Sequence, residues 1–380
     1  MHILAFNRLR SLDVFRGLTV CFMIIVNTPG SYETAYAPLL HTAWHGFTPT
    51  DLVFPSFLFA VGNALSFVAV KWQTMPQQQV LFKIFKRSFI IFLLGYLMYW
   101  FPFVSFDADH NLQLLPFANT RVFGVLQRIA LCYLFAALLF YYLKERWVYI
   151  IAVMVLLLYW AVMMGFGTGP DPLSIKTNAG LRLDLWLLGP NHLYKGEGFP
   201  FDPEGLLSTF PAMVNVIAGY WVGKHIQTKG NTYEMLSKLL LFGVAMVTIG
   251  YVWDWWFPIN KKLWTSSYVC YTVGLSSLVL AVSTYFIDFK QQQKGVWFFE
   301  VFGKNPLFIY LLSEVLAILL WFIPITQSDG SSTQLYPFIY ETIFKPMGAY
   351  FGSFVFALVF MLLNWSAGYV LHRRKIYIKV

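Results

Sequence analysis

Ten stretches of mostly apolar residues, most of them close to 20 residues long, limit what this chain can fold into. A hydrocarbon core of about 30 Å is crossed by roughly 20 helical residues at 1.5 Å per residue. In lipid every backbone N–H and C=O needs a partner within the protein, so such runs must be helices. The stretches are roughly Leu12–Gly30, Leu52–Val70, Ser88–Val104, Val122–Leu143, Trp147–Phe166, Leu206–Val222, Leu239–Trp253, Ser266–Ile287, Pro306–Ile325 and Tyr350–Leu371.

The composition agrees with this interpretation. The chain is 58% hydrophobic and 12% charged, whereas soluble domains have about 45–50% apolar and about 25% charged residues. A soluble globular domain, a disordered chain and a coiled coil are therefore excluded. The three cysteines lie inside apolar stretches without a Cys-x-x-Cys motif, which excludes a disulfide framework and a structural zinc site. We predict an all-α, polytopic integral membrane helix bundle in which residues 1–380 form one transmembrane domain.

The basic residues test the number of spans. With a cytoplasmic N-terminus and ten spans, 18 of the 27 Lys and Arg residues fall on the cytoplasmic side, 7 outside and 2 within spans. This asymmetry is what the positive-inside rule predicts. It places both termini in the cytoplasm and explains the net charge of +9 without a nucleic-acid partner. Two long segments then face outside, at residues 28–51 and 167–205, and the second is predicted to be a loop with local turns.

Ionisable residues within the predicted spans are candidates for function, because charge at membrane depth is costly. Asp13 and Arg16 share one helix face at i, i+3, so mutual neutralisation is as good an explanation as function. Arg128 and Glu314 lie deeper in their spans. They are expected to face a polar cavity, with a structural ion pair as the alternative.

The outer segment contains the two closely spaced histidines, His41 and His45. A metal would require both on one helix, but neighbouring Pro and Gly residues limit a helix here to about one turn, so no metal is predicted. With an ordinary pKa of about 6.5, His41 can accept a proton or attack an acyl group. Asn27, just before this segment, could orient the imidazole or donate to an oxyanion; the alternative is a helix C-terminal role.

Several motifs of the chain resemble one family. They are RLRSLDVFRGLTVCFMIIVN (Arg8–Asn27), HTAWHGFTPTDLVFPSFLFAVG (His41–Gly62), GVLQRIALCY (Gly124–Tyr133), FDPEGLLST (Phe201–Thr209), LWTSSYVCYTVGLSS (Leu263–Ser277) and GKNPLFIYLLSEV (Gly303–Val315). Taken together, and in this order, the chain is similar to the transmembrane acyltransferase family of heparan-alpha-glucosaminide N-acetyltransferase and its bacterial relatives. The resemblance covers nearly the whole chain.

The resemblance implies that an acetyl group moves from cytosolic acetyl-CoA to an amino sugar on the outer side. The family histidine of the H-x-x-W-x-G motif corresponds to His41, and the asparagine ending the preceding helix corresponds to Asn27. The chain differs from the lysosomal enzyme in a slightly longer intervening loop, in His45 where asparagine is usual, and in lacking the large lumenal N-terminal region. We therefore expect a multi-pass protein of a bacterial plasma (inner) membrane, surrounded by lipid and forming a homodimer.

This function suggests roles for further polar residues. CoA is anionic, so the basic cytoplasmic face is its expected entrance. The residues expected along its path are Arg16, Gln127, Arg128, Lys304 and Asn305. The residues expected to contact the amino sugar are Asp51, Asp202, Glu204 and Glu314, although helix capping is a strong alternative for Asp51. The alternative function is a secondary transporter of a small polar or sugar-like solute, which buried charges and Pro/Gly-broken helices would suit.

Overall fold

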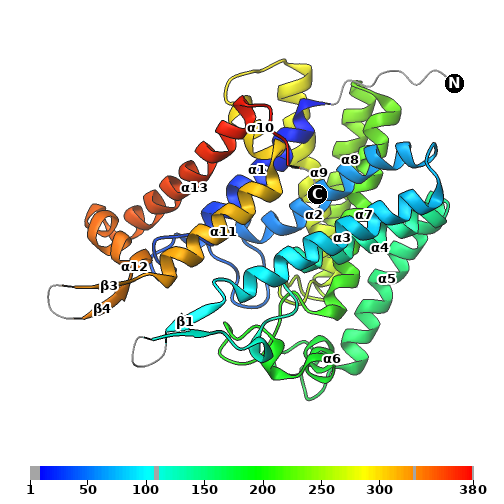
Figure 1. Cartoon of the computed structure of the whole chain (residues 1–380). Helices are drawn as coiled ribbons and strands as arrows, with labels where there is room; N and C mark the ends of the chain where they lie inside the picture. Colours follow the sequence, from blue (N-terminus) through cyan, green and yellow to red (C-terminus); the bar gives the residue numbers. More distant parts are fainter. Residues whose placement is uncertain (1–8, 107–110, 328–330, 379–380) are drawn as a thin grey trace.

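The structure is a computed structural model of the chain and describes residues 9–106, 111–327 and 331–378. The all-helical prediction is confirmed: long helices cross the whole molecule, and the described strands form only two short antiparallel hairpins (Figure 1). The helices are α1 (Arg10–Asn27), α2 (Val53–Trp72), α3 (Gln77–Trp100), α4 (Val125–Tyr142), α5 (Glu145–Phe166), α6 (Ala179–Leu188), α7 (Leu206–Lys229), α8 (Tyr233–Trp253), α9 (Ser266–Thr284), α10 (Val296–Lys304), α11 (Pro306–Phe322), α12 (Leu335–Ile339) and α13 (Ala349–Arg373). The hairpins pair β1 (Val104–Phe106) with β2 (Leu112–Leu114), and β3 (Pro324–Thr326) with β4 (Ser332–Gln334).

Each of the ten predicted spans contains a helix, but not every helix is apolar enough to be a span by itself. Among the described residues, seven helices are long and apolar enough to cross a membrane. An eighth span results if α10 and α11, which meet at an 83° bend, are counted as one. Helices α1 and α3 fall outside this set, so the number ten and the cytoplasmic position of the termini remain predictions.

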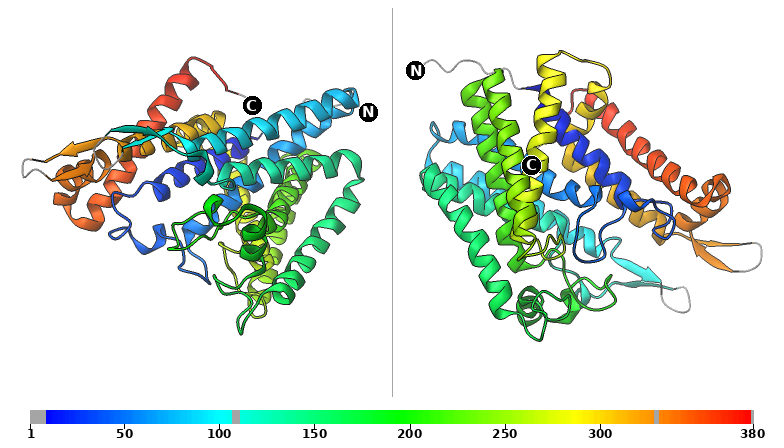
Figure 2. Two further views of the ribbon diagram at one scale, coloured as in Figure 1. Left: turned by 60° about the horizontal axis from the view of Figure 1, so that its bottom comes forward. Right: turned by 180° about the vertical axis from the view of Figure 1, so that it is seen from behind.

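The helices run alternately up and down, which gives the bundle two distinct ends. The two hairpins, α6 and the segment after α1 lie at one end, which we call the hairpin end (Figures 1 and 2). The start of α1, the turn between α2 and α3, and α10 lie at the other end, which we call the tail end, because Asn305 there binds the backbone of Ile376 and Ile378. The two long segments predicted to face outside therefore lie opposite the C-terminal tail. The second of them contains α6, a ten-residue helix that the sequence analysis had treated as loop.

Small residues allow the central helices to pack closely. A Cβ placed at Gly62 of α2 would lie 1.9 Å from the carbonyl oxygen of Val216 in α7, and one at Gly219 would lie 2.0 Å from that of Phe59. Lipid offers little hydrophobic driving force between helices, so close backbone contact of this kind is what holds membrane bundles together.

Close packing at a glycine also joins α1 to α10 at the tail end. A Cβ at Gly17 would lie 1.8 Å from the carbonyl oxygen of Phe299. Helix α1 is capped from outside its own sequence, since the Asp288 carboxylate accepts the backbone N–H groups of Arg10 and Ser11 at 3.1 and 3.2 Å. These contacts fix Arg16, whose Nε donates to the carbonyl oxygen of Gly303 at 2.8 Å.

Candidate active site

The loop that carries His41 is held by its own hydroxyl groups. The 3₁₀ turn Pro49–Leu52 begins with a capping box in which Thr48 and Asp51 satisfy each other's backbone N–H groups. The Thr48 hydroxyl also donates to the carbonyl oxygen of Leu40 at 2.7 Å, and the Thr50 hydroxyl donates to that of Pro38 at 3.0 Å. The chain on both sides of His41 is thereby tied to the start of α2.

His41 and Asp51 form a close pair within this loop. The His41 Nδ1 atom lies 2.7 Å from Asp51 Oδ1. The Asp51 side chain is fully buried, whereas the His41 side chain is 41% exposed. The second carboxylate oxygen accepts the backbone N–H and the hydroxyl of Thr48, both at 3.0 Å. A carboxylate fixed in this way requires the proton of a neutral imidazole to sit on Nδ1, which leaves a lone pair on Nε2.

A lysine from the segment between α8 and α9 approaches the same imidazole. Lys261 Nζ lies 2.8 Å from His41 Nε2 and 3.1 Å from Nδ1. Burial lowers the pKa of His41 from its ordinary value; the hydrogen bond to Asp51 opposes this shift, and the charge of Lys261 adds to it. Burial also lowers the pKa of Lys261. The neutral imidazole is therefore the favoured form near pH 7.

His41 opens into a cavity of about 360 Å³ at the hairpin end, which we call the outer cavity. Asn27, Asp51, Glu204 and Glu314 line it as well, so four of the residues predicted from the sequence share one space with His41. Asn27, however, does not orient the imidazole in the described structure. Its amide lies 3.5 Å from Glu314 Oε1, and Asp51 provides the orienting contact.

An arginine cluster forms another part of the outer cavity wall. Arg121 donates to both oxygens of Asp202, at 2.8 and 2.6 Å, and to Glu204 at 2.6 Å. Its guanidinium also lies 4.8 Å from the Tyr99 ring and 4.7 Å from the Tyr194 ring. Burial opposes ionisation of Glu204, but the nearby cations hold the pKa of its carboxyl below the ordinary value. Asp202 does not line the cavity; it binds Arg121, which does.

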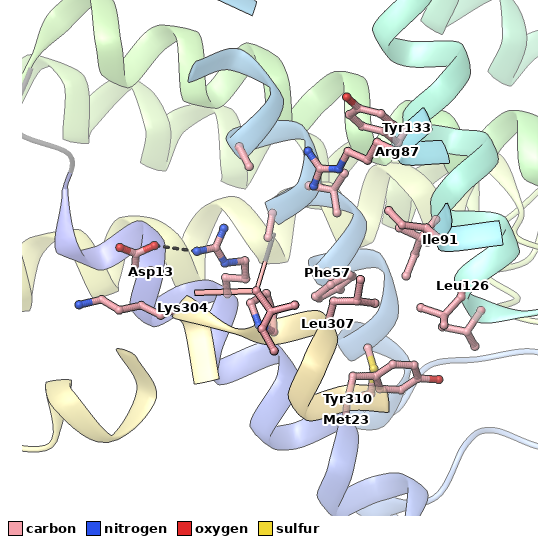
Figure 3. Close-up of a pocket in the computed structure, with 18 of the residues that line it drawn as sticks. Asp13, Met23, Phe57, Arg87, Ile91, Leu126, Tyr133, Lys304, Leu307 and Tyr310 are labelled. Atoms are coloured by element: carbon pink, nitrogen blue, oxygen red, sulfur yellow. Dashed lines mark hydrogen bonds and ion pairs between the residues drawn. The ribbon is translucent and has the colours of Figure 1, made fainter. Parts of the chain in front are cut away.

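A second cavity of about 440 Å³, which we call the inner cavity, opens towards the tail end. Arg16, Arg87 and Lys304 line it, together with an apolar wall that includes Phe57 and Leu307 (Figure 3). Arg16 is paired with Asp13 at 2.8 Å, and the Arg87 guanidinium lies 4.7 Å from the Tyr133 ring. Asp13 lines the cavity too, so three cations and one carboxylate leave a net positive charge, and the rest of the lining is largely apolar.

The two cavities adjoin in the middle of the bundle. Met23, Val125 and Tyr310 line both of them, and Figure 3 shows Met23 and Tyr310 at one side of the inner cavity, away from Asp13 and Lys304. Side chains of α1, α4 and α11 thus lie at the junction between the inner cavity and the outer cavity that contains the His41–Asp51 pair.

Three residues predicted along the CoA path lie elsewhere. Arg128 is buried, stacks 4.8 Å from Trp264, and donates to Ser208 Oγ and the carbonyl oxygen of Gly205. Gln127 is buried against Gly95. Asn305 is buried and binds the C-terminal tail. Among the described residues, none of the three lines either cavity. Arg128 and Asn305 each join two chain segments through hydrogen bonds, whereas Gln127 makes no side-chain hydrogen bond in the described structure.

The sequence did not single out three cations that line the cavities, Arg87, Arg121 and Lys261. Each lies near the end of an apolar stretch, where a basic residue indicates only how the chain is oriented in the membrane. The Nδ1 atom of His45 lies 3.3 Å from Asn260 Nδ2. In the described parts of the chain, no cluster of three His, Cys, Asp or Glu residues could hold a metal.

A bundle of apolar helices with two adjoining cavities, the outer of which is lined by a His–Asp pair, is typical of an integral membrane protein. The family model described as "Heparan-alpha-glucosaminide N-acetyltransferase, catalytic" matches residues 8–251, and the chain belongs to this family. It is 28% identical over 363 residues to heparan-alpha-glucosaminide N-acetyltransferase of Mus musculus, covering 82% of this chain and 54% of that protein. For the enzyme of the same name from Homo sapiens, the identity is 28% over 362 residues, covering 81% and 53%. The chain thus spans about half the length of these curated relatives.

Proposed function

We propose that this protein transfers the acetyl group of cytosolic acetyl-CoA, through the helix bundle, to the amine of a glucosamine-type sugar on the opposite side of a bacterial plasma membrane. The family supports acetyl transfer. The observation that carries the transmembrane route is that the inner and outer cavities adjoin at Met23, Val125 and Tyr310, with the His41–Asp51 pair beyond this junction.

The inner cavity suits acetyl-CoA. Arg16, Arg87 and Lys304 provide positive charge for the phosphates, and guanidinium groups bind phosphate through two parallel hydrogen bonds. The thin pantetheine arm carries no charge, so it can lie along the apolar wall towards Tyr310. The thioester then reaches the junction while the nucleotide stays at the tail end.

His41 offers two routes for the chemical step. In the first, Nε2 attacks the thioester carbonyl, the C–S bond breaks and CoA leaves as the thiolate; the acceptor amine then attacks the acetyl-imidazole, and the imidazole is released. In the second, the amine attacks the thioester carbonyl directly while Nε2 removes its proton, and the C–S bond breaks so that CoA leaves as the thiolate. Both routes need an unprotonated Nε2, which the Nδ1–Asp51 hydrogen bond supports.

The outer cavity suits an amine-bearing acceptor. Glu314 lines it, and no cation forms an ion pair with Glu314 among the described residues. A partly buried carboxylate without a cation is a suitable partner for the ammonium group of an amino sugar. Glu204 and Tyr194 add polar groups near the same space.

Purified protein incubated with labelled acetyl-CoA and a panel of amino sugars tests the proposal. We expect an N-acetylated sugar from the natural sequence, none from His41→Ala, and near-normal transfer from His45→Asn, the matched control in the same loop. Thermal unfolding of each variant in detergent checks that the fold is retained. A His41→Ala variant that keeps most of its activity would remove His41 from the reaction.

The same preparation separates the remaining alternatives. With acetyl-CoA alone, mass spectrometry should detect an acetyl group on His41 only if the acetyl-imidazole route operates. A secondary transporter would leave the sugar unchanged and consume no thioester. Transport without acetylation in proteoliposomes would refute the proposed function.

A further inference from the structure

We propose that Lys261 is a further catalytic residue: its charge helps to keep the imidazole of His41 unprotonated until the substrates arrive, and then supports the negative oxygen that forms on the thioester carbonyl. This inference rests on the proposed function, and it assigns a role to a residue outside the motifs that carry the family resemblance. Its first part concerns the imidazole itself, so it can be measured without any acetyl transfer.

The geometry gives Lys261 one principal partner. Its Nζ atom lies 2.8 Å from His41 Nε2, and an ammonium group can only donate hydrogen bonds. Because Nδ1 gives its proton to Asp51, the Nε2 lone pair is the acceptor for Lys261. The contact is compatible only with a neutral imidazole, since protonation would place two donors face to face.

The segment that carries Lys261 is firmly held. The carbonyl oxygen of Lys261 accepts the N–H of Trp264 at 3.1 Å, and Asn260 Oδ1 accepts the N–H of Leu263 at 2.8 Å. Trp264 is fully buried and packs edge-to-face against Phe54 of α2, with the ring centroids 5.1 Å apart. The backbone beneath Lys261 is therefore anchored to the helix that follows the His41 loop.

The neighbouring Lys262 differs from Lys261 in its ion pairing. Lys262 pairs with Glu197 at 2.7 Å, and both side chains are about 20% exposed. Within the described part of the chain, Lys261 forms no ion pair with a carboxylate within 4.0 Å, although it lines the same cavity. The hydrogen-bond contact of Lys261 is therefore with the imidazole, and its charge also acts on the nearby carboxylates of Asp51 and Glu204. Lys262, in contrast, is in direct contact with a carboxylate.

The charges around His41 come from three elements. Asp51, in the turn before α2, and Glu204, before α7, favour the protonated imidazole, whereas Lys261 disfavours it. The cavity also contains Glu314 of α11 and the paired Arg121. Of these groups, only Lys261 is a cation in hydrogen-bond contact with the ring, so removal of its charge should raise the pKa of His41.

When a thioester takes the place of Lys261 at Nε2, the ammonium group stays next to the reacting carbon. As the carbonyl oxygen becomes negative, an ammonium group that its anchored backbone holds beside the thioester stabilises this oxygen. This is the usual function of an oxyanion-binding group. Lys261→Met should therefore lower the rate of transfer as well as raise the pKa of His41. Lys261→Arg, which keeps the charge, should restore much of both.

The test is the pH dependence of His41 carbethoxylation by diethyl pyrocarbonate, which reacts with neutral imidazole only. The natural protein, Lys261→Met, Lys261→Arg and the control Lys262→Met are treated in detergent, and the modified peptide is followed by mass spectrometry, with fragment ions separating His41 from His45. We expect the midpoint in Lys261→Met to move upward by about one pH unit or more, and those of the other two variants to stay near that of the natural protein.

Coincident midpoints for Lys261→Met and the natural protein, or an equal shift in Lys262→Met, would overturn the inference. Thermal unfolding ensures that each variant is folded when it is modified. If the midpoint shifts as expected but no acetyl-CoA is consumed by the natural protein, the proposed function fails while the control of His41 by Lys261 stands. If transfer occurs but the midpoint does not shift, the inference alone fails.

Discussion

Replacement of Asp51 by asparagine tests the site most directly, because it replaces one carboxylate oxygen of a fully buried side chain by an NH₂ group. In the native loop, one carboxylate oxygen accepts from His41 at 2.7 Å and the other from the N–H and hydroxyl of Thr48, both at 3.0 Å. Asparagine can keep the Thr48 contacts with its carbonyl oxygen. Its NH₂ group must then face His41 Nδ1, which becomes an acceptor, so the imidazole proton moves to Nε2.

The magnitudes follow from these contacts. The substitution exchanges a hydrogen bond to a charged group, worth about 1.5–3 kcal/mol, for a neutral one worth about 0.5–1.5 kcal/mol, so stability should fall by about 1–1.5 kcal/mol. The cost to catalysis is larger, since Nε2 no longer has a lone pair and general-base or nucleophilic assistance is worth about 10²- to 10⁴-fold. We therefore expect Asp51→Asn to fold, to unfold at a lower temperature, and to lose at least about 100-fold in the rate of acetyl transfer.

Thr48→Ala is the matched control. It removes the capping hydroxyl, at a cost of about 1 kcal/mol, but leaves the His41–Asp51 hydrogen bond in place. Initial rates with saturating acetyl-CoA and acceptor, together with thermal unfolding in the same detergent, distinguish the two variants. If Asp51→Asn stays within tenfold of the natural rate, or if Thr48→Ala is equally inactive, the argument from the imidazole tautomer is wrong.

Three further predictions concern the junction, the packing and the pH dependence. Val125→Trp should fill the junction of the two cavities and abolish transfer. Acetyl-CoA should still bind in calorimetry through its nucleotide, which stays at the tail end; complete loss of binding would contradict a route through Val125. Gly62→Ala should destabilise the bundle by about 1–3 kcal/mol through overpacking, because the alanine Cβ would meet the carbonyl oxygen of Val216. The control Gly165→Ala has open space around the new Cβ and should not be destabilised. Equal melting temperatures for the two variants would refute this packing argument. Because the pKa of His41 is lowered from 6.5, the rate should hold from pH 7.5 to about pH 6.5 and fall at lower pH as the imidazole is protonated; a fall that begins above pH 7 would contradict the neutral resting state.

The helical elements followed from the sequence to a large extent. The apolar runs predicted α2, α4, α5, α7, α8, α9 and α13 as membrane-crossing helices, because a run of this length has no other way to satisfy its backbone in lipid. The runs did not predict α6, which is short and lies outside the apolar stretches. Nor did they predict the two hairpins, since β1 and β3 begin inside the ends of two stretches that are predicted to be helical. They also did not predict the bend between α10 and α11, where Pro306 begins a new helix.

The site was only partly visible in the sequence. His41, Asn27 and Glu314 could be singled out, and the structure brings them to one cavity. The role of Asp51 was split between sugar binding and capping, whereas it caps the turn and also contacts His41. Arg128 was chosen for its depth, yet it fastens α4 to the start of α7 through Ser208. Charge at membrane depth therefore indicated importance but not the kind of contact.

By itself, the sequence determined that this chain is an apolar helix bundle with a histidine loop between its first two long helices, because periodicity and hydrophobic length act locally along the chain. Only the tertiary structure decided which side chains meet. Lys261 is 220 residues from His41, and the junction of the cavities combines α1, α4 and α11. Contacts over such separations depend on how whole helices pack, and the glycines that allow this packing give no sign in the sequence of which partner they will face.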